Sequence, residues 1–113
     1  MNAFRALLVA ITLALAGYTA MAVGHDGWNL FPIFFADVAK VGWAGQFDLD
    51  FSCYLLLSGS WIAWRHRFTP AGIALGLLGT IGGTLMLAPY LIIEGSRAKG
   101  DMRALLLGDR ATE

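Results

Sequence analysis

The sequence predicts an all-α membrane protein with three transmembrane helices in one domain, residues 1–113. The first observation is composition: 58% of the residues are hydrophobic and 14% are charged, which is too apolar for a soluble domain of 113 residues. The second is that three long stretches lack charged residues, at 6–24, 51–64 and 68–93. Because a helix needs about 20 residues to cross about 30 Å of hydrocarbon, we expect helices over about 4–24, 45–64 and 70–93.

The first apolar stretch has two interpretations. We expect a retained transmembrane helix, because the apolar run is longer than the core of a usual signal peptide. The alternative is a signal peptide, in which Arg5 precedes the apolar core and Ala20-Met21-Ala22 is a small-residue cleavage site. The two interpretations differ in whether the mature protein keeps this helix.

The second stretch is too short to span a membrane alone, so its helix must extend backward to about Gly45. This extension places Asp48 and Asp50 in the first turns of the helix, near the membrane interface. A basic turn, Arg65-His66-Arg67, follows on the opposite membrane face and leads to Pro70, a residue suited to the first turn of the third helix. After that helix, residues 95–113 form a polar tail.

The segment between the first and second helices is too polar to span a membrane comfortably. Phe34, Val38 and Val41 recur there at helical spacing, which indicates a short helix lying in the membrane interface. The alternative is a fourth, weakly hydrophobic span over residues 28–45.

Three spans would bring the end of the first helix, the start of the second and the end of the third to one membrane face. That face would hold an interfacial charge cluster of Asp37, Lys40, Glu94, Arg97 and Lys99. Basic residues occur on both sides, so orientation is open, and we favour an inside amino terminus because the first helix usually dominates.

In an alternative interpretation, some polar groups on that face are catalytic residues. A carboxylate near hydrocarbon is unfavourable unless it is paired, protonated or hydrated. The candidate catalytic residues of this alternative are Asp48, Asp50, Tyr90 and Glu94. The simpler interpretation of the aspartates is that one caps the helix and the other points into the bundle.

A stripe of glycines follows the third predicted helix. Its members are Gly72, Gly76, Gly79 and Gly83, at i, i+4, i+7 and i+11. Bare backbone lets another helix approach closely, so we expect this face to pack against a helix of the same chain. The alternative is that it accepts an apolar ligand, such as a lipid tail, quinone or carotenoid, or a helix of a partner.

Several function classes find no support in the sequence. Eight basic and eight acidic residues give no net charge, and no basic patch indicates nucleic-acid binding. The single cysteine, Cys53, excludes an internal disulfide and a cysteine-based zinc site. His25 and His66 are expected on opposite faces, and we find no metal-ligand spacing, phosphate loop or nucleophile paired with a histidine. The sequence identifies no cofactor.

Four short features carry a resemblance: Phe34-Phe35-Ala36-Asp37, Phe47-Asp48-Leu49, the basic turn and Pro89-Tyr90-Leu91. Together they resemble a family of small three-helix bacterial integral membrane proteins of unknown function, over roughly the last three quarters of the chain. The chain departs from that pattern at Asp37, where an asparagine is expected, and at Asp50, which adds a second acid. The resemblance implies the three-helix layout and a bacterial inner membrane, and it supplies no mechanism.

The leading functional hypothesis is a non-enzymatic accessory subunit. It would use the glycine-lined face and exposed aromatic residues to bind a larger membrane complex, lipid or pigment. Three short helices bury little surface alone, which favours other membrane subunits or a homo-oligomer as partners, besides lipid. The alternative is a small membrane enzyme or carrier for a lipidic or quinone-like substrate that uses interfacial carboxylates.

Overall fold

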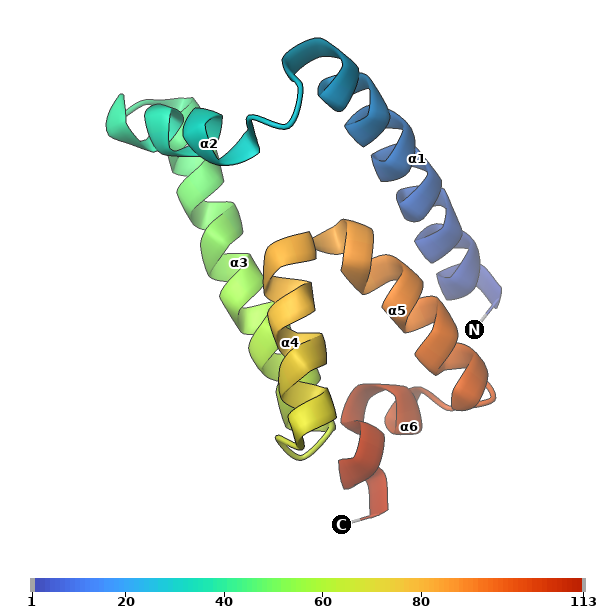
Figure 1. The fold of residues 1–113 in the computed structure, drawn as a ribbon. Helices are drawn as coiled ribbons and strands as arrows, with labels where there is room; N and C mark the ends of the chain where they lie inside the picture. The colour runs from blue at the N-terminus through green and yellow to red at the C-terminus, as the bar shows by residue number, and fades with distance from the viewer. Residues whose placement is uncertain (1, 113) are drawn as a thin grey trace.

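The computed structural model describes residues 2–112, which form only helices and their connections. The helices are α1 (Asn2–Asp26), α2 (Leu30–Ala39), α3 (Trp43–Arg65), α4 (Pro70–Gly82), α5 (Thr84–Arg97), α6 (Met102–Leu107) and the short 3-10 helix η1 (Gly108–Thr112). Figure 1 shows their arrangement. The prediction of an all-α protein is confirmed, and a short helix, α2, lies between the first two long ones.

The prediction of three transmembrane helices is wrong. Among the described residues only α1, with 25 residues, is both long enough and apolar enough to cross a membrane. Helix α3 has 23 residues, but Asp48, Asp50 and several serines make it more polar than a typical span. The third expected span, over residues 70–93, is two helices of 13 and 14 residues.

The break between α4 and α5 is at Gly83. Its backbone has φ of +61° and ψ of −147°, a conformation that is essentially restricted to glycine because a β-carbon would clash. The continuous apolar run therefore does not form one helix. Figure 1 shows α5 turning back at this point, so that it runs toward the end of the molecule where the turn between α3 and α4 lies.

Helices α3 and α4 form a tightly packed antiparallel hairpin. The Thr69 side chain accepts a hydrogen bond of 3.2 Å from the backbone N–H of Gly72, and Pro70 occupies the first turn of α4. A β-carbon on Gly76 would lie 2.6 Å from the carbonyl oxygen of Gly59. The two backbones can approach this closely only because both positions are glycine.

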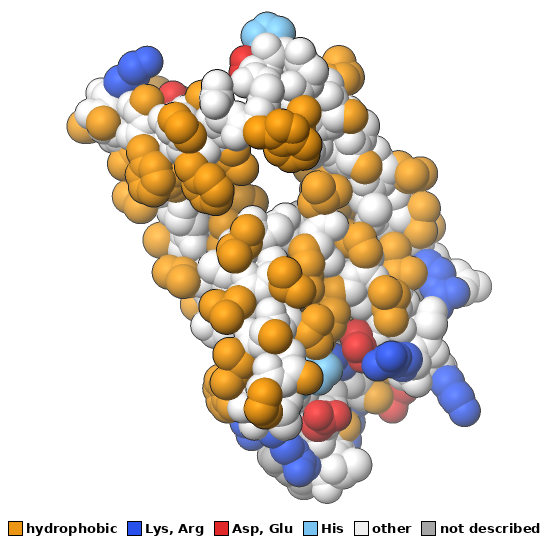
Figure 2. All heavy atoms as spheres, viewed as in Figure 1, with side chains coloured by type: hydrophobic (Ala, Val, Ile, Leu, Met, Phe, Trp, Pro, Cys, Tyr) orange, Lys and Arg blue, Asp and Glu red, His pale blue; other side chains and the backbone are white. Residues whose placement is uncertain are grey.

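The remaining helices pack in pairs around this hairpin. Helix α1 lies against α5, and α2 lies against the start of α3. The described core is small: its buried apolar side chains are Leu8, Ile62, Ala63, Ala88, Tyr90 and Leu105. Large apolar side chains are therefore left on the outside, over α1, α2, α3 and α4, and Figure 2 shows them spread across one face of the molecule.

Candidate functional site

A polar cluster occupies the end of the molecule where the α3–α4 turn, the end of α5 and the C-terminal segment meet. We call it the Arg65 cluster; its members are Arg65, His66, Tyr90, Glu94 and Asp109. Figure 2 shows most of the charged side chains in view gathered at this end, whereas the middle of the molecule is apolar. The cluster is the main concentration of buried polar groups among residues 2–112.

Arg65 is the centre of the cluster and is only 2% exposed. Its Nε donates to the carbonyl oxygen of Leu105 at 2.9 Å, and its Nη1 donates to the Tyr90 hydroxyl at 2.7 Å. Nη1 also lies 3.4 Å from Oε2 of Glu94. A buried charge is tolerated only when it is paired and hydrogen-bonded, and these partners from α5 and α6 supply both conditions.

Tyr90 and His66 contact each other beside Arg65 in the cluster. Because the Tyr90 hydroxyl accepts from Arg65, its own proton is free to be donated to Nε2 of His66, 2.6 Å away. That assignment places the histidine proton on Nδ1, which lies 3.9 Å from Oδ2 of Asp109. Burial raises the pKa of Tyr90 above its ordinary value, although the hydrogen bond and charge of Arg65 act in the opposite direction.

A polar cleft of about 340 Å³ borders the cluster. Its walls include Arg97, Ala98, Ala104 and Gly108 in addition to cluster residues. Within the described part of the chain, every buried side-chain nitrogen or oxygen already has a hydrogen-bond partner. The hydrogen bonds of Arg65 therefore hold the C-terminal segment against α3 and α5.

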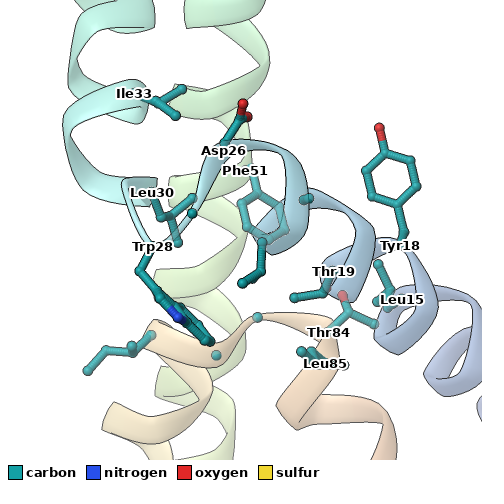
Figure 3. A pocket seen from close by; sticks show the side chains of 16 residues that line it. Leu15, Tyr18, Thr19, Asp26, Trp28, Leu30, Ile33, Phe51, Thr84 and Leu85 are labelled. Carbon is teal, nitrogen blue, oxygen red and sulfur yellow. The ribbon is translucent and has the colours of Figure 1, made fainter.

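A second hollow is almost entirely apolar and lies between α1, α2, Phe51 of α3 and the α4–α5 break. We call it the apolar cavity; its volume is about 520 Å³. Figure 3 shows Leu15 and Thr19 reaching it from α1, Trp28 from the following loop, and Thr84 and Leu85 from the start of α5. This volume is within the range of small-molecule sites, which are typically apolar with few polar groups.

The four candidate catalytic residues do not come together. Tyr90 and Glu94 belong to the Arg65 cluster, whereas Asp48 and Asp50 lie in the first turns of α3, at the other end of that helix. Desolvation raises the pKa of Asp48, and repulsion by and a hydrogen bond with Asp37 raise it further. The acidic group that acts on Asp48 is therefore Asp37 of α2, and not Glu94.

The expected interfacial charge cluster is divided in the same way. Asp37 and Lys40 lie on or directly after α2, while Glu94, Arg97 and Lys99 lie at the end of α5 and just after it. Glu94 does contact Arg97, at 3.7 Å between Oε1 and Nη1. The division follows from the break at Gly83, because α5 runs back toward the α3–α4 turn.

The glycines predicted to pack against a helix lie along α3. Gly72, Gly76 and Gly79 are buried, and β-carbons on Gly76 and Gly79 would meet Gly59 and Ile62 of α3. Gly83 sits at the break, where a β-carbon would lie 2.9 Å from Cζ of Phe51. A face occupied by α3 has no room for a ligand.

Sequence reasoning missed the central role of Arg65 and the contribution of the C-terminal segment. It treated Arg65 and His66 as part of a basic turn on the membrane face opposite Tyr90 and Glu94. The pair Gly82-Gly83 inside the apolar run is a signal that could have indicated the break. No comparable signal connects Arg65 to Leu105, which is 40 residues away.

Comparisons with protein-family models, curated proteins and solved structures gave no match. Among the described residues, no group of three or more His, Cys, Asp or Glu side chains is arranged to hold a metal ion. The features that bear on function are therefore the exposed apolar surface, the Arg65 cluster and the apolar cavity.

Proposed function

We propose that this protein is a non-enzymatic, membrane-associated accessory subunit. The observation that carries the proposal is the apolar surface of α1. In its apolar 18-residue stretch only 6% of the residues are buried inside the protein, which favours lipid or a partner over water as the surrounding of this helix. Lipid and the helices of a larger membrane complex are the partners that match this chemistry.

The other helices support the same proposal. Exposed large apolar side chains continue along the outer face of α3, at Phe47, Leu49, Tyr54, Leu56 and Leu57. Monomeric soluble proteins rarely expose contiguous apolar surface on this scale. The glycines of α4 are already used against α3, so the proposal assigns partner contacts to the outer faces of α1 and α3.

The Arg65 cluster favours a structural role over catalysis. Arg65 donates to Tyr90 and to the Leu105 carbonyl, and His66 lies within hydrogen-bond distance of the same tyrosine hydroxyl. A catalytic group must be free to contact a substrate, whereas these groups hold three segments of the chain together. This arrangement supports an accessory protein more than an enzyme that uses Tyr90 and Glu94.

Membrane association is tested by flotation of the purified protein with liposomes on a density gradient. We expect the native protein to float with the vesicles. Leu13→Glu, which puts a charge on the exposed apolar face of α1, should reduce the floating fraction strongly, because a charge in hydrocarbon is unfavourable by about 2.5–3.5 kcal/mol. Ala111→Glu adds the same charge in the polar tail and should float normally. Native protein that stays with the soluble fraction would overturn the proposal.

The accessory role is tested by extraction of the native protein in mild detergent, followed by mass spectrometry and an absorption spectrum. Partner subunits should co-purify in fixed stoichiometry, and the Leu13→Glu variant should lose them. Localisation to a bacterial inner membrane, which the proposal also expects, is tested separately by membrane fractionation of the source cells. A colourless protein that purifies alone or only with itself contradicts the accessory role.

A further inference from the structure

The apolar cavity has the volume and lining of a site for an apolar molecule. Its floor is the α4–α5 break, where Gly82 and Gly83 have no side chains, and its walls come from α1 and α2. Figure 3 shows the Trp28 indole directed toward this floor and Phe51 reaching in from α3. The volume of about 520 Å³ is open on one side and is lined by segments separated widely in the sequence.

Water is a poor occupant for this cavity. A buried water needs two to four polar partners. The side-chain polar groups of the described lining are the Thr19 and Thr84 hydroxyls, the Tyr18 hydroxyl, the Trp28 N–H and the Asp26 carboxylate. Figure 3 shows the Tyr18 hydroxyl directed away from the cavity. A hydrocarbon chain needs no hydrogen bonds and gains from apolar contact.

The opening of the cavity indicates where the occupant comes from. The lining includes Tyr18 of α1 and Leu30 of α2, which belong to the exposed apolar surface of those helices. Figure 2 shows the molecule hollowed here, with apolar side chains around the opening. A chain in surrounding lipid can therefore enter without crossing a polar barrier.

The charge of Asp26 restricts which headgroup a bound lipid can carry. Asp26 is the one charged residue in the described lining, and its side chain is 52% exposed and paired with His25 at 2.7 Å. A carboxylate at the rim repels a fatty-acid carboxylate and attracts an ammonium group. The lining thus fits a lipid whose headgroup carries an amine.

We propose that the apolar cavity binds one hydrocarbon chain of a membrane lipid, with the ammonium of a zwitterionic headgroup at Asp26. This inference rests on the proposed membrane association, because the lipid enters from the bilayer. It places lipid binding at the junction of α1, α2 and the α4–α5 break, and not at Gly76 and Gly79, which face α3.

The test uses tryptophan fluorescence, because Trp28 lines the cavity. Phosphatidylethanolamine with brominated chains, which quench tryptophan on contact, is added to the full-length protein in detergent micelles. We expect saturable quenching that is lost in Trp28→Phe and kept in Trp43→Phe, since Trp43 lies outside the cavity lining. Quenching that is unsaturable, or unchanged in Trp28→Phe, would overturn the site.

A matched pair of variants tests occupancy. Thr19→Phe fills the cavity, whereas Ala20→Phe places the same ring on an exposed neighbouring position that does not line it. We expect Thr19→Phe to raise the half-saturating lipid fraction on the order of tenfold or more, the ratio that a loss of about 1.4 kcal/mol produces. Ala20→Phe should match the native protein. Equal saturation in both variants would contradict a chain bound in this cavity.

Two further measurements separate the parts of the inference. Brominated phosphatidylglycerol, which carries a net negative charge, should saturate at a higher lipid fraction than the ethanolamine lipid. Asp26→Asn should remove this difference. Equal saturation by the two lipids in the native protein overturns the headgroup assignment. Thr19→Phe should still float with liposomes. Normal flotation with no saturable quenching rejects the cavity site alone, whereas failed flotation of the native protein rejects the membrane association on which it rests.

Discussion

At the scale of single residues, Arg65 has the strongest effect that the structure predicts. Arg65→Met leaves Glu94 without its buried partner and the Leu105 carbonyl without its donor. Removal of one member of a buried ion pair typically lowers the free energy of unfolding by about 3–5 kcal/mol, and we expect that range in chemical denaturation in detergent. Arg97→Met is the control: Arg97 is 75% exposed and also pairs with Glu94, so its loss should change stability by at most about 1 kcal/mol. Equal losses in the two variants would contradict the central role of Arg65.

Tyr90 gives the protein a predicted dependence on alkaline pH. Burial raises its pKa above the ordinary value of 10.0, so the unfolded state releases this proton at lower pH than the folded state. The stabilisation is therefore complete below about pH 10 and is lost as the pH rises through the higher folded pKa. Denaturation at a series of pH values should show this decline, and Tyr90→Phe should flatten it. Ultraviolet titration of tyrosinate checks the assignment, because the variant should lose the step with the highest pKa.

At the scale of elements, the break between α4 and α5 depends on Gly83. Gly83→Ala forces a β-carbon into a backbone conformation with φ of +61° and to within 2.9 Å of Phe51. We expect the free energy of unfolding to fall by about 1–3 kcal/mol, the range for a strained backbone position. Gly17→Ala in α1 meets nothing within 4 Å and should be neutral or stabilising by up to about 1 kcal/mol. If Gly83→Ala is as stable as Gly17→Ala, the break does not require glycine.

At the scale of the whole molecule, the C-terminal segment closes the polar end. The Leu105 side chain is 1% exposed, so Leu105→Ala leaves a cavity and should lower the free energy of unfolding by about 2–5 kcal/mol. It should also speed tryptic cleavage after Arg103, because the segment separates from α3 and α5 more often. The neighbouring Leu106 is 50% exposed, and Leu106→Ala should leave cleavage close to the native rate. Fast cleavage of the native protein itself would show that the segment is not held.

The predictable part of the fold was local. The expected helices over about 4–24 and 45–64 correspond to α1 and α3, which run slightly further at each end. Apolar runs and Pro70 were sufficient signals for these elements. The expected helix over 70–93 begins correctly at Pro70 but breaks at Gly83, because one backbone conformation outweighed a continuous apolar pattern.

The candidate site was less predictable, because its residues are brought together by the direction in which α5 runs after Gly83. A straight third helix would have carried Tyr90 and Glu94 to the end of the molecule that holds Asp48. The bend at Gly83 carries them to Arg65 instead. Residues of the predicted charge cluster are therefore divided between two ends, with Asp37 and Lys40 at one and Glu94, Arg97 and Lys99 at the other.

By itself, the sequence determined that the chain is helical, that α1 is apolar along its length, and that the charges lie at helix ends. These properties follow from composition and from contacts between residues near one another in the chain. Only the tertiary structure decided which ends meet. The partners of Arg65 lie 25 and 40 residues away at Tyr90 and Leu105, and the apolar cavity is formed by helices that no local pattern relates. Both depend on the direction that the chain takes after Gly83.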